Sequence, residues 1–224
     1  GIVSHDLRNP LNVISLGSAV LASSEELQGN AAKSVLRIQA AARRSERLIR
    51  DLLDFTEARV GGGISVVPVA GNVFEVVREV VDNACIVHPH ADIGLTCDGS
   101  GEAQFDADRL AQALTNLLAT AAQYGATGEP IPVHVDAQGP RLVFSVRNRG
   151  APIDAALLPS LFEPLQRGTV DASHARRSVG LGLYIVAAIA RAHGGSVDVR
   201  SNAEEGTTFA FCLPRTTRQD GAPA

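Results

Sequence analysis

Cysteine is scarce in this 224-residue chain, and its three copies are far apart. Cys85, Cys97 and Cys212 are odd in number and form no C-x-x-C pair, so the sequence predicts neither a disulfide framework nor a zinc site, and a reducing cytoplasm fits best. Basic charge is not in excess either, because 20 Lys and Arg stand against 24 Asp and Glu, a formal net charge of −4. Nucleic-acid binding is therefore not expected, since a phosphate backbone requires a basic surface.

Long apolar runs are absent too. The longest, residues 183–190, is far shorter than the roughly 18 residues that cross a bilayer, and no signal-peptide pattern opens the chain. We expect a cytoplasmic location and no membrane contact by this fragment, whether its parent protein is soluble or membrane-anchored. Hydrophobic residues (45%) and charged residues (20%) have ordinary globular proportions, which exclude a disordered or collagen-like chain.

Two segments at the start of the chain have helical spacing. Apolar residues recur at three-, four- and seven-residue steps between residues 2 and 27, and again between residues 31 and 60. Two amphipathic helices joined by a short loop cannot enclose a core alone. They predict a helical hairpin over residues 1–60 that pairs with a second copy in a dimeric four-helix bundle. Packing of the hairpin on the rest of its own chain is the alternative.

The next segment is predicted to be a hinge linker, residues 61–66, because three consecutive glycines leave the backbone free. Helices are expected at 73–81 and 109–124. Short β-branched runs predict strands at 93–96, 131–135, 142–146, 196–201 and 207–213. Because strands come in consecutive pairs, residues 67–215 should form an α+β sandwich, a mostly antiparallel sheet with helices on one face. Residues 216–224 are expected to form a tail.

A histidine beside a carboxylate lies on the first predicted helix, in the run Ser4-His5-Asp6-Leu7-Arg8-Asn9-Pro10-Leu11. A neutral imidazole is a good nucleophile, and a neighbouring carboxylate can orient the ring and accept its proton. Asp6 would have to reach sideways, because adjacent helical residues point in different directions. Asn9 lies one turn from His5, where its amide could hold a water or a phosphoryl oxygen. A plain surface histidine is the alternative.

A polar stripe marks the predicted helix 109–124, where Gln112, Asn116, Thr120 and Tyr124 recur every fourth residue. Such a stripe could line a ligand cleft and supply oxygen ligands to a metal-bound phosphate. The alternative is a solvated helix face.

Two glycine-containing turns follow later in the chain. Asn148 ends a predicted strand that runs into a Gly/Pro turn, where its amide could bind an adenine edge; alone, this is an ordinary turn. The run Gly180-Leu181-Gly182-Leu183 precedes an apolar helix, so that backbone N–H groups and the positive helix end would face an anion. By itself this G-x-G pattern is a weak signal.

Taken together and in this order, the patterns resemble the two-component sensor histidine kinases. The matches are the H-box at 5–11, the N-box at 112–124, the G1 box at 146–153, the F-box at 161–164, the G2 box at 178–186 and the final strand at 206–214. The resemblance implies a dimerisation and histidine-phosphotransfer hairpin followed by an ATP-binding domain of the Bergerat (GHKL) type, which gyrase and Hsp90 share.

The resemblance also implies a reaction. His5 would attack the γ-phosphate of Mg-ATP with Asp6 as base, and the phosphoryl group would pass to an aspartate on the receiver domain of a response regulator. Asn9 would aid dephosphorylation of that partner. Asn116 and Thr120 would be Mg²⁺ ligands. The implied ATP-binding residues are Gln112, Asn116, Thr120, Gln123, Tyr124, Asn148, Gly150, Phe162, Arg167, Gly180, Leu181, Gly182, Leu183 and Thr208, with Arg167 on a lid at 165–177.

Four residues depart from the family's pattern, one of them Pro152, which stands where the family has the second Gly of the G1 box. Thr120 stands where the family has an Asn ligand of Mg²⁺, and Gln123 stands where it has a phosphate-contacting Lys. A threonine hydroxyl can ligate Mg²⁺ but is shorter than an amide, and Gln123 removes one positive charge. Asn148 replaces an Asp, a variant similar to that of bacteriophytochrome-type kinases. Weakened ATP handling is predicted, and two alternatives stay open: a degenerate relay or scaffold, and a phosphatase-biased module acting through Asn9.

Overall fold

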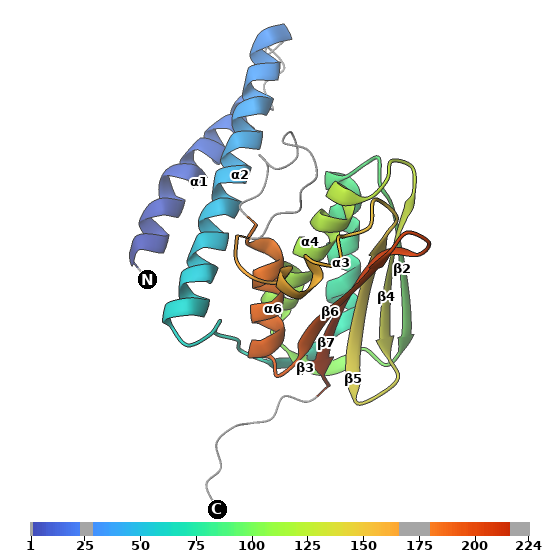
Figure 1. The fold of residues 1–224 in the computed structure, drawn as a ribbon. Helices are drawn as coiled ribbons and strands as arrows, with labels where there is room; N and C mark the ends of the chain where they lie inside the picture. Colours follow the sequence, from blue (N-terminus) through green and yellow to red (C-terminus); the bar gives the residue numbers. More distant parts are fainter. Residues whose placement is uncertain (1, 23–28, 166–179, 216–224) are drawn as a thin grey trace, which may run out of the picture. The chain divides into compact units, whose positions relative to one another are not determined.

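The computed structural model describes residues 2–22, 29–165 and 180–215, and for residues 2–10 and 12 only the backbone (Figure 1). The chain divides into two compact units, residues 1–59 and 60–224.

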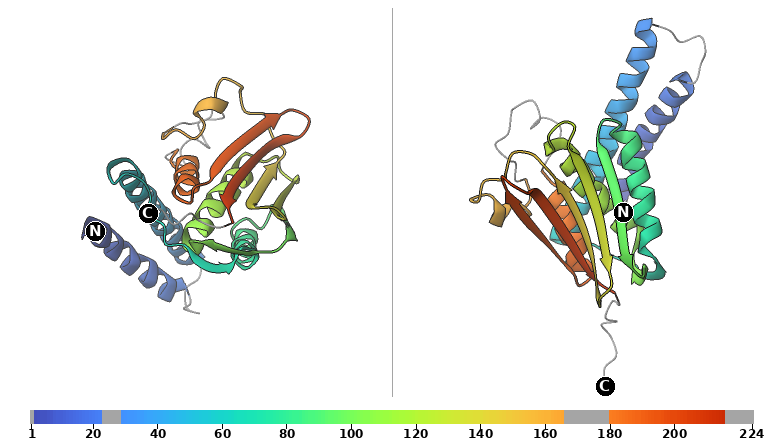
Figure 2. Two further views of the ribbon diagram at one scale, coloured as in Figure 1. Left: turned by 90° about the horizontal axis from the view of Figure 1, so that it is seen from below. Right: turned by 90° about the vertical axis from the view of Figure 1, so that its right-hand side faces the viewer.

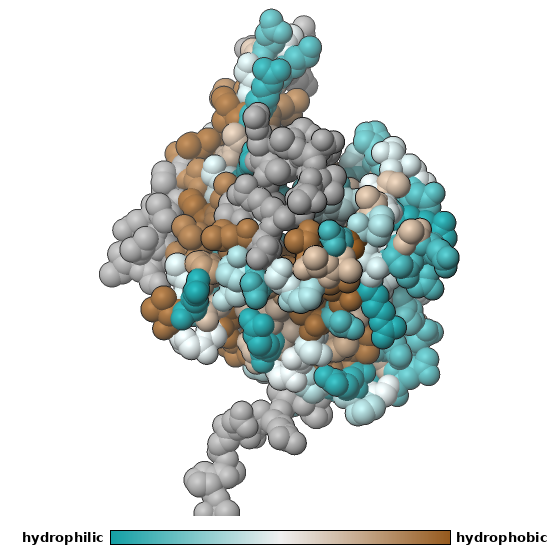
Figure 3. Space-filling model, viewed as in Figure 1, coloured by the Kyte–Doolittle hydropathy of each residue, from teal (hydrophilic) through white to brown (hydrophobic). Residues whose placement is uncertain are grey.

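The first unit is a pair of helices, α1 (Ile2–Ala22) and α2 (Gly29–Val60). Ser15 Oγ donates a hydrogen bond of 2.6 Å to Glu46 Oε1 and fixes the register between the helices. Val35 and Ala42 are buried, yet many large apolar side chains of the pair are 45–72% exposed, and several colour the hairpin brown in Figure 3. They are Val13, Ile14, Leu16, Val20, Leu21, Leu36, Ile38 and Leu52. This unit therefore leaves an apolar surface uncovered.

The second unit is a sandwich of one helical layer and one sheet (Figure 2). The sheet has the order β2-β4-β5-β7-β6, and only the β2–β4 pairing is parallel. Its strands are β2 (Asp92–Gly99), β4 (Pro130–Ala137), β5 (Arg141–Asn148), β6 (Ser196–Asn202) and β7 (Gly206–Pro214). The helices are α3 (Val73–Val87), α4 (Ala107–Tyr124) and α6 (Gly182–Ala192), with a short 3₁₀ turn at Leu158–Ser160. The predicted fold class is confirmed.

Two short strands and part of one helix were not predicted. β1 (Val69–Asn72) and β3 (Glu102–Phe105) form a separate antiparallel ladder of four residues each. Half of their eight residues are exposed, and four residues are too few for either strand to show a reliable periodic pattern. Asn72 caps α3, its Oδ1 accepting the Phe74 N–H at 3.0 Å. The helix then runs six residues beyond the predicted end at 81, and none of these six residues is buried, so no apolar stripe marks this last part of the helix.

The core lies between the sheet and the helices. Strict alternation sends Leu142, Phe144, Val146 and Asn148 of β5 toward the helices. On β7 the same face carries Thr207, Phe209, Phe211 and Leu213, and the rings of Phe144 and Phe211 are 5.8 Å apart. The helices contribute leucines and isoleucines that are almost fully buried: Leu110, Leu114, Leu117, Leu118, Ile185 and Ile189.

Arg215 closes one end of the sandwich. Its guanidinium donates hydrogen bonds to the carbonyls of Ser100 and Glu102, both at 2.8 Å, and of Gly139 at 3.2 Å, with a further bond to the Ala137 carbonyl. One side chain thus ties the turn after β2 to the turn after β4.

Candidate functional site

The polar stripe of α4 borders the core. At about 100° per residue, Gln112, Thr120 and Gln123 lie within about 40° of the direction of Asn116. The buried residues of α4, such as Leu110 and Ala121, centre roughly 120° away, and the exposed Thr115 lies on the opposite side of the stripe. A solvated face would lie opposite the core, so this position favours the lining of a cleft.

The glycine turn before α6 meets this stripe. Asn116 Nδ2 donates to the Gly182 carbonyl at 3.4 Å, and a Cβ at position 182 would lie 3.7 Å from Asn116 Cγ. Gly180 has φ +76°, a left-handed conformation that favours glycine. Its carbonyl accepts the Leu165 N–H at 3.0 Å, which joins the two ends of the segment 166–179. Residues 112–124 and 180–183, predicted to share a site, are therefore neighbours.

Unused hydrogen-bonding groups follow one another along the stripe. Among the described residues, Asn116 Oδ1 accepts no hydrogen bond. Thr120 Oγ1 donates to the Asn116 carbonyl at 2.7 Å, which leaves its lone pairs available. Gln123 Nε2 is buried and has no hydrogen-bond partner in the described part of the chain. The stripe thus presents two oxygen acceptors and then an N–H donor, and leaving that donor unpaired costs about 1–3 kcal/mol.

At its other end, α4 packs against the turn that follows β5. Ala126 N–H donates to the Arg149 carbonyl at 2.6 Å. A Cβ at Gly150 would overlap the Tyr124 carbonyl oxygen, so only glycine lets the two backbones come this close. Asn148, at the end of β5, is 3% exposed, and Tyr124 is 39% exposed.

Thr207, and not Thr208, lies on the same side of the sheet as Asn148. Asn148 and Thr207 are direct partners across β5 and β7, whereas Thr208 pairs with Arg147 on the open face. Thr207 Oγ1 lies 2.7 Å from Ser201 Oγ, which accepts the Ile153 N–H at 2.9 Å. Successive strand residues point to opposite faces, so the structure places Thr207 and not the predicted Thr208 beside Asn148, and a role of Thr208 in ATP binding stays a prediction. The sequence analysis did not single out Thr207 or Ser201; the alternation of strand residues is the signal that could have indicated Thr207.

Several predicted site residues are described by the structure but offer few free polar atoms to a ligand. For others, the residue or its side chain lies outside the described part of the chain. Gln112 Oε1 accepts from Arg109 Nη1 at 3.0 Å. Phe162 and Leu183 are half-buried, and Leu181 is 3% exposed. Arg167 and the lid after Leu165 lie outside the described part. His5, Asp6 and Asn9 lie on α1, with His5 and Asn9 one turn apart, and their side chains are not described.

Titratable groups away from the stripe have shifted pKa values. Burial, and then the neighbouring carboxylate of Asp54, raise the pKa of Asp51 on α2 to about 6. Burial also raises the pKa of the Cys97 and Cys212 thiols, whereas Cys85 is exposed. Cys85 and Cys97 line a groove of about 450 Å³ between α3 and β2, at the sheet edge remote from β6 and β7.

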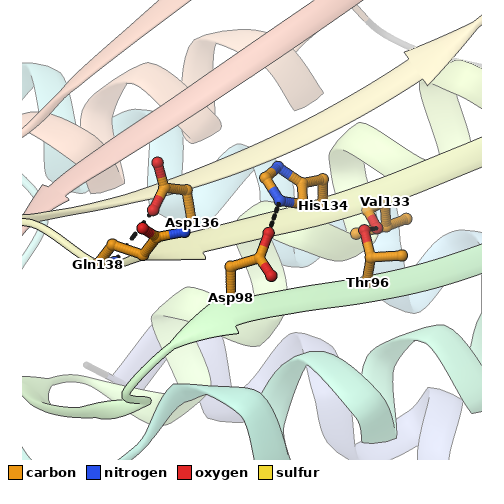
Figure 4. Close-up of polar contacts among 6 residues, drawn as sticks. All are labelled: Thr96, Asp98, Val133, His134, Asp136 and Gln138. Atoms are coloured by element: carbon orange, nitrogen blue, oxygen red, sulfur yellow. Dashed lines mark hydrogen bonds and ion pairs between the residues drawn. The ribbon is translucent and has the colours of Figure 1, made fainter.

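The open face of the sheet carries a hydrogen-bonded histidine and aspartate. His134 Nε2 lies 2.9 Å from Asp98 Oδ2 on the adjacent strand (Figure 4). Both side chains are about half exposed, so the pair contributes little to stability. Within the described residues, no three His, Cys, Asp or Glu side chains gather as a metal site, and no helix is long and apolar enough to span a membrane.

Two family models match the chain. One, the His Kinase A (phospho-acceptor) domain, matches residues 1–61, and the other, the histidine kinase-, DNA gyrase B-, and HSP90-like ATPase, matches residues 105–217. The second covers half of the chain and includes the α4 stripe, the turn after β5 and the glycine turn. The chain belongs to the two-component sensor histidine kinases.

Relatives of this histidine kinase chain support the assignment. It is 36% identical over 218 residues to a bacteriophytochrome of Pseudomonas aeruginosa and 27% identical over 225 residues to the sensor protein SrrB of Staphylococcus aureus. These matches cover 97% and 95% of the chain but only 29% and 37% of the relatives. The chain therefore spans about a third of the length of these relatives.

Solved structures share the fold of this kinase chain. Full-length ShkA, solved in complex with AMPPNP, has a TM-score of 0.72 at 24% identity and covers all of the chain, which corresponds to 46% of ShkA. The nucleotide-free catalytic domain of the histidine kinase ThkA has a TM-score of 0.57 at 26% identity, covering 67% of the chain and 97% of that domain.

Proposed function

We propose that this chain is the kinase core of a sensor histidine kinase, which phosphorylates His5 from Mg-ATP and passes the phosphoryl group to an aspartate of a response regulator. The observation that carries the proposal is the order of unused groups along α4, two oxygen acceptors followed by a buried donor, beside the glycine turn of α6. These groups suit a metal-bound phosphate, since Mg²⁺ takes oxygen ligands and a phosphate oxygen accepts an N–H.

The residues around the α4 stripe would bind different parts of the nucleotide. Asn148, buried beside Thr207, would accept a hydrogen bond from the adenine amino group. The backbone N–H groups at the start of α6 would face the phosphates, because the first turn of a helix has unpaired donors and a positive dipole end. Asn116 and Thr120 fit Mg²⁺, which, when bound, would neutralise phosphate charge. Gln123 would donate to a phosphate oxygen in place of a lysine.

Phosphoryl transfer requires the catalytic unit to reach the α1 helix. The linker before the catalytic unit contains Gly62 and Gly63, whose φ angles are +80° and +137°, and there is open space around both residues. His5 would attack the γ-phosphate in line, at about 3–3.5 Å, and Asp6 would accept its proton. Most of the catalysis then comes from positioning and charge neutralisation.

The hairpin is the proposed dimer interface. Its uncovered apolar side chains need a partner surface, and two antiparallel hairpins can bury such stripes in a four-helix bundle. The receiver domain of a response regulator would then approach His5 on this bundle.

The decisive test is transfer of label from γ-³²P-ATP with Mg²⁺. We expect a label that is stable in base, lost in acid and absent from His5→Gln, while the matched variant His90→Gln, changed at an exposed turn, keeps it. No label at millimolar nucleotide with Mg²⁺ or Mn²⁺ would contradict the kinase proposal.

A weak-binding relay or scaffold is the second candidate, favoured by Thr120, whose side chain is shorter than the family's Asn, and by Gln123, which lacks the charge of the family's Lys. Calorimetry with an ATP analogue separates it from the kinase. Gln123→Lys restores a charge-assisted bond and should tighten binding about tenfold, a gain of roughly 1.4 kcal/mol; Thr120→Asn should add to it. A wild-type chain that binds no nucleotide and gains binding only in these variants would support the relay.

The phosphatase-biased alternative acts through Asn9 and has a separate test. Asn9→Ala should slow the decay of the receiver acyl phosphate and leave His5 labelling intact. Equal loss of both would argue against a distinct role for Asn9.

A further inference from the structure

We infer that Asp106 is a positioning residue, which fastens the end of the interdomain linker to the two helices of the nucleotide site and so orients the catalytic unit on its tether. The inference rests on the proposed function, since this orientation matters only if the catalytic unit must find His5. It is carried by a set of hydrogen bonds at the start of α4, at the opposite end of that helix from Tyr124.

Asp106 uses both carboxylate oxygens. Oδ1 accepts the Arg109 N–H at 3.1 Å and caps α4. Oδ2 accepts the Val67 N–H at 2.9 Å. Val67 precedes Pro68, which has no N–H, and the β1–β3 ladder begins only at Val69 opposite Phe105. The carboxylate therefore fixes the linker two residues before the ladder does.

His193 connects Asp106 to α6. Its Nε2 accepts the Asp106 N–H at 3.1 Å, and its Nδ1 lies 2.9 Å from the Ile189 carbonyl. A backbone N–H can only donate and a carbonyl can only accept, so these partners specify a neutral ring with hydrogen on Nδ1. The ring is 3% exposed and holds the end of α6 against the start of α4.

The helix pair is therefore pinned at two places. One is the Asn116–Gly182 contact and the other is the Asp106–His193 bond. Along α4 the two contacts are 10 residues apart, which is about 15 Å at 1.5 Å per residue, and along α6 they are 11 residues apart, about 16.5 Å. From one contact to the other the residue numbers rise on α4 and fall on α6, so the two helices are antiparallel. Antiparallel helices fixed over matching lengths move together, so the Val67–Asp106 bond ties the linker to the body that carries the α4 stripe.

Breaking this bond loosens the part of the linker next to the ladder. Ile64 is 5% exposed, so the stretch with open space around it is the glycine run that ends at Gly63, and the Val67–Asp106 bond holds the segment between Ile64 and the ladder in place. Without the bond this segment can shift, and transfer should slow because the catalytic unit is no longer held in one orientation on its tether. Nucleotide binding should not change, since the Asn116–Gly182 contact is untouched.

The test uses the full chain with Asp106→Asn, which keeps an oxygen to cap α4 but turns an N–H₂ toward Val67. Asp106→Ser is the second variant, because its one hydroxyl can still cap the helix and cannot also reach Val67. Asp136→Asn is the matched control: Asp136 Oδ1 caps an exposed turn by accepting the Gln138 N–H at 3.0 Å, on the open face of the sheet (Figure 4).

Three measurements decide the matter. We expect hydrogen exchange of the Val67 amide to become about tenfold faster in both Asp106 variants, nucleotide affinity to stay within twofold, and the rate of His5 labelling at saturating ATP to fall; Asp136→Asn should change none of these. Unchanged Val67 exchange would overturn the clamp, and faster exchange with an unchanged labelling rate would overturn its role in positioning. If the wild-type chain itself never labels His5, the proposed function fails, while the exchange result still reports on the clamp.

Discussion

Adjacent threonines on β7 allow a sharp test of the site. Thr207→Val and Thr208→Val each replace a hydroxyl by a methyl group of nearly equal size, one residue apart. Thr207 is 5% exposed, bonded to Ser201 and paired with Asn148, whereas Thr208 lies on the open face opposite Arg147. If strand parity decides which residue borders the nucleotide, the two variants should behave differently.

The magnitude follows from the contacts. Thr207→Val removes the hydrogen bond to Ser201 Oγ, but Ser201 still accepts the Ile153 N–H, so no group is fully orphaned. The loss is then about 1 kcal/mol, which corresponds to a melting temperature lower by about 2–4 °C for a unit of this size. A nucleotide contact of the hydroxyl would add a similar loss in binding, about fivefold or more. Thr208→Val should change unfolding by less than about 0.5 kcal/mol.

The assay is chemical unfolding of the full chain together with titration of a fluorescent ATP analogue. We expect weaker binding and lower stability for Thr207→Val only. Weaker binding in Thr208→Val with unchanged binding in Thr207→Val would refute the placement of the pocket between the sheet and the helices. Loss in both would show that the two faces are not separated as the register of β5 and β7 requires.

Three other predictions concern regions outside the stripe. Because burial and a neighbouring carboxylate raise the pKa of Asp51 from 3.8 to about 6, the folded state takes up a proton that the unfolded state does not hold, and stability falls as pH rises through that interval. Asp51→Asn should therefore stabilise the hairpin at pH 7 by about 1 kcal/mol, allowing for partial exposure, and by nothing below about pH 4, as thermal unfolding against pH would show. Iodoacetamide should modify the exposed Cys85 of the native protein before Cys97 and Cys212, whose thiol pKa values burial raises; mass spectrometry of timed samples would contradict this if all three react together. Arg215→Lys should lower the unfolding free energy by about 2 kcal/mol, since an ammonium group cannot hold all of the carbonyls that the guanidinium reaches, and a denaturation midpoint equal to wild type would oppose that role.

Long periodic elements were predictable from the sequence. The α4 pattern repeats over 18 residues and the β5 alternation over eight, so local chemistry alone specifies their type and their buried face. β1 and β3 are four residues long, and what holds them is pairing between residues 30 to 36 positions apart in the chain, which no local pattern records. The extension of α3 past residue 81 was missed for a related reason: the stripe of buried residues ends before the helix does.

For the candidate site, the sequence predicts which residues share one side of a single helix, but not which residues of different elements lie together. A four-residue interval places Asn116 and Thr120 on one side of α4, and this follows from helical geometry. The choice between Thr207 and Thr208 depends on which face of β7 meets the helices. A shift of one residue in register exchanges those faces, so the answer needs the pairing with Asn148.

The sequence does not show which polar groups have hydrogen-bond partners in the folded chain. These partners distinguish two polar residues at the ends of α4, Asp106 and Gln123. Asp106 at the start of α4 uses both carboxylate oxygens, for the N–H groups of Arg109 and Val67, as expected of a residue that holds structure in place. Gln123 near the end of α4 has a buried donor with no partner among the described residues, as expected of a residue that binds a ligand. Both are ordinary polar side chains in the sequence. Their hydrogen-bond partners in three dimensions are what favour a positioning role for Asp106 and a binding role for Gln123.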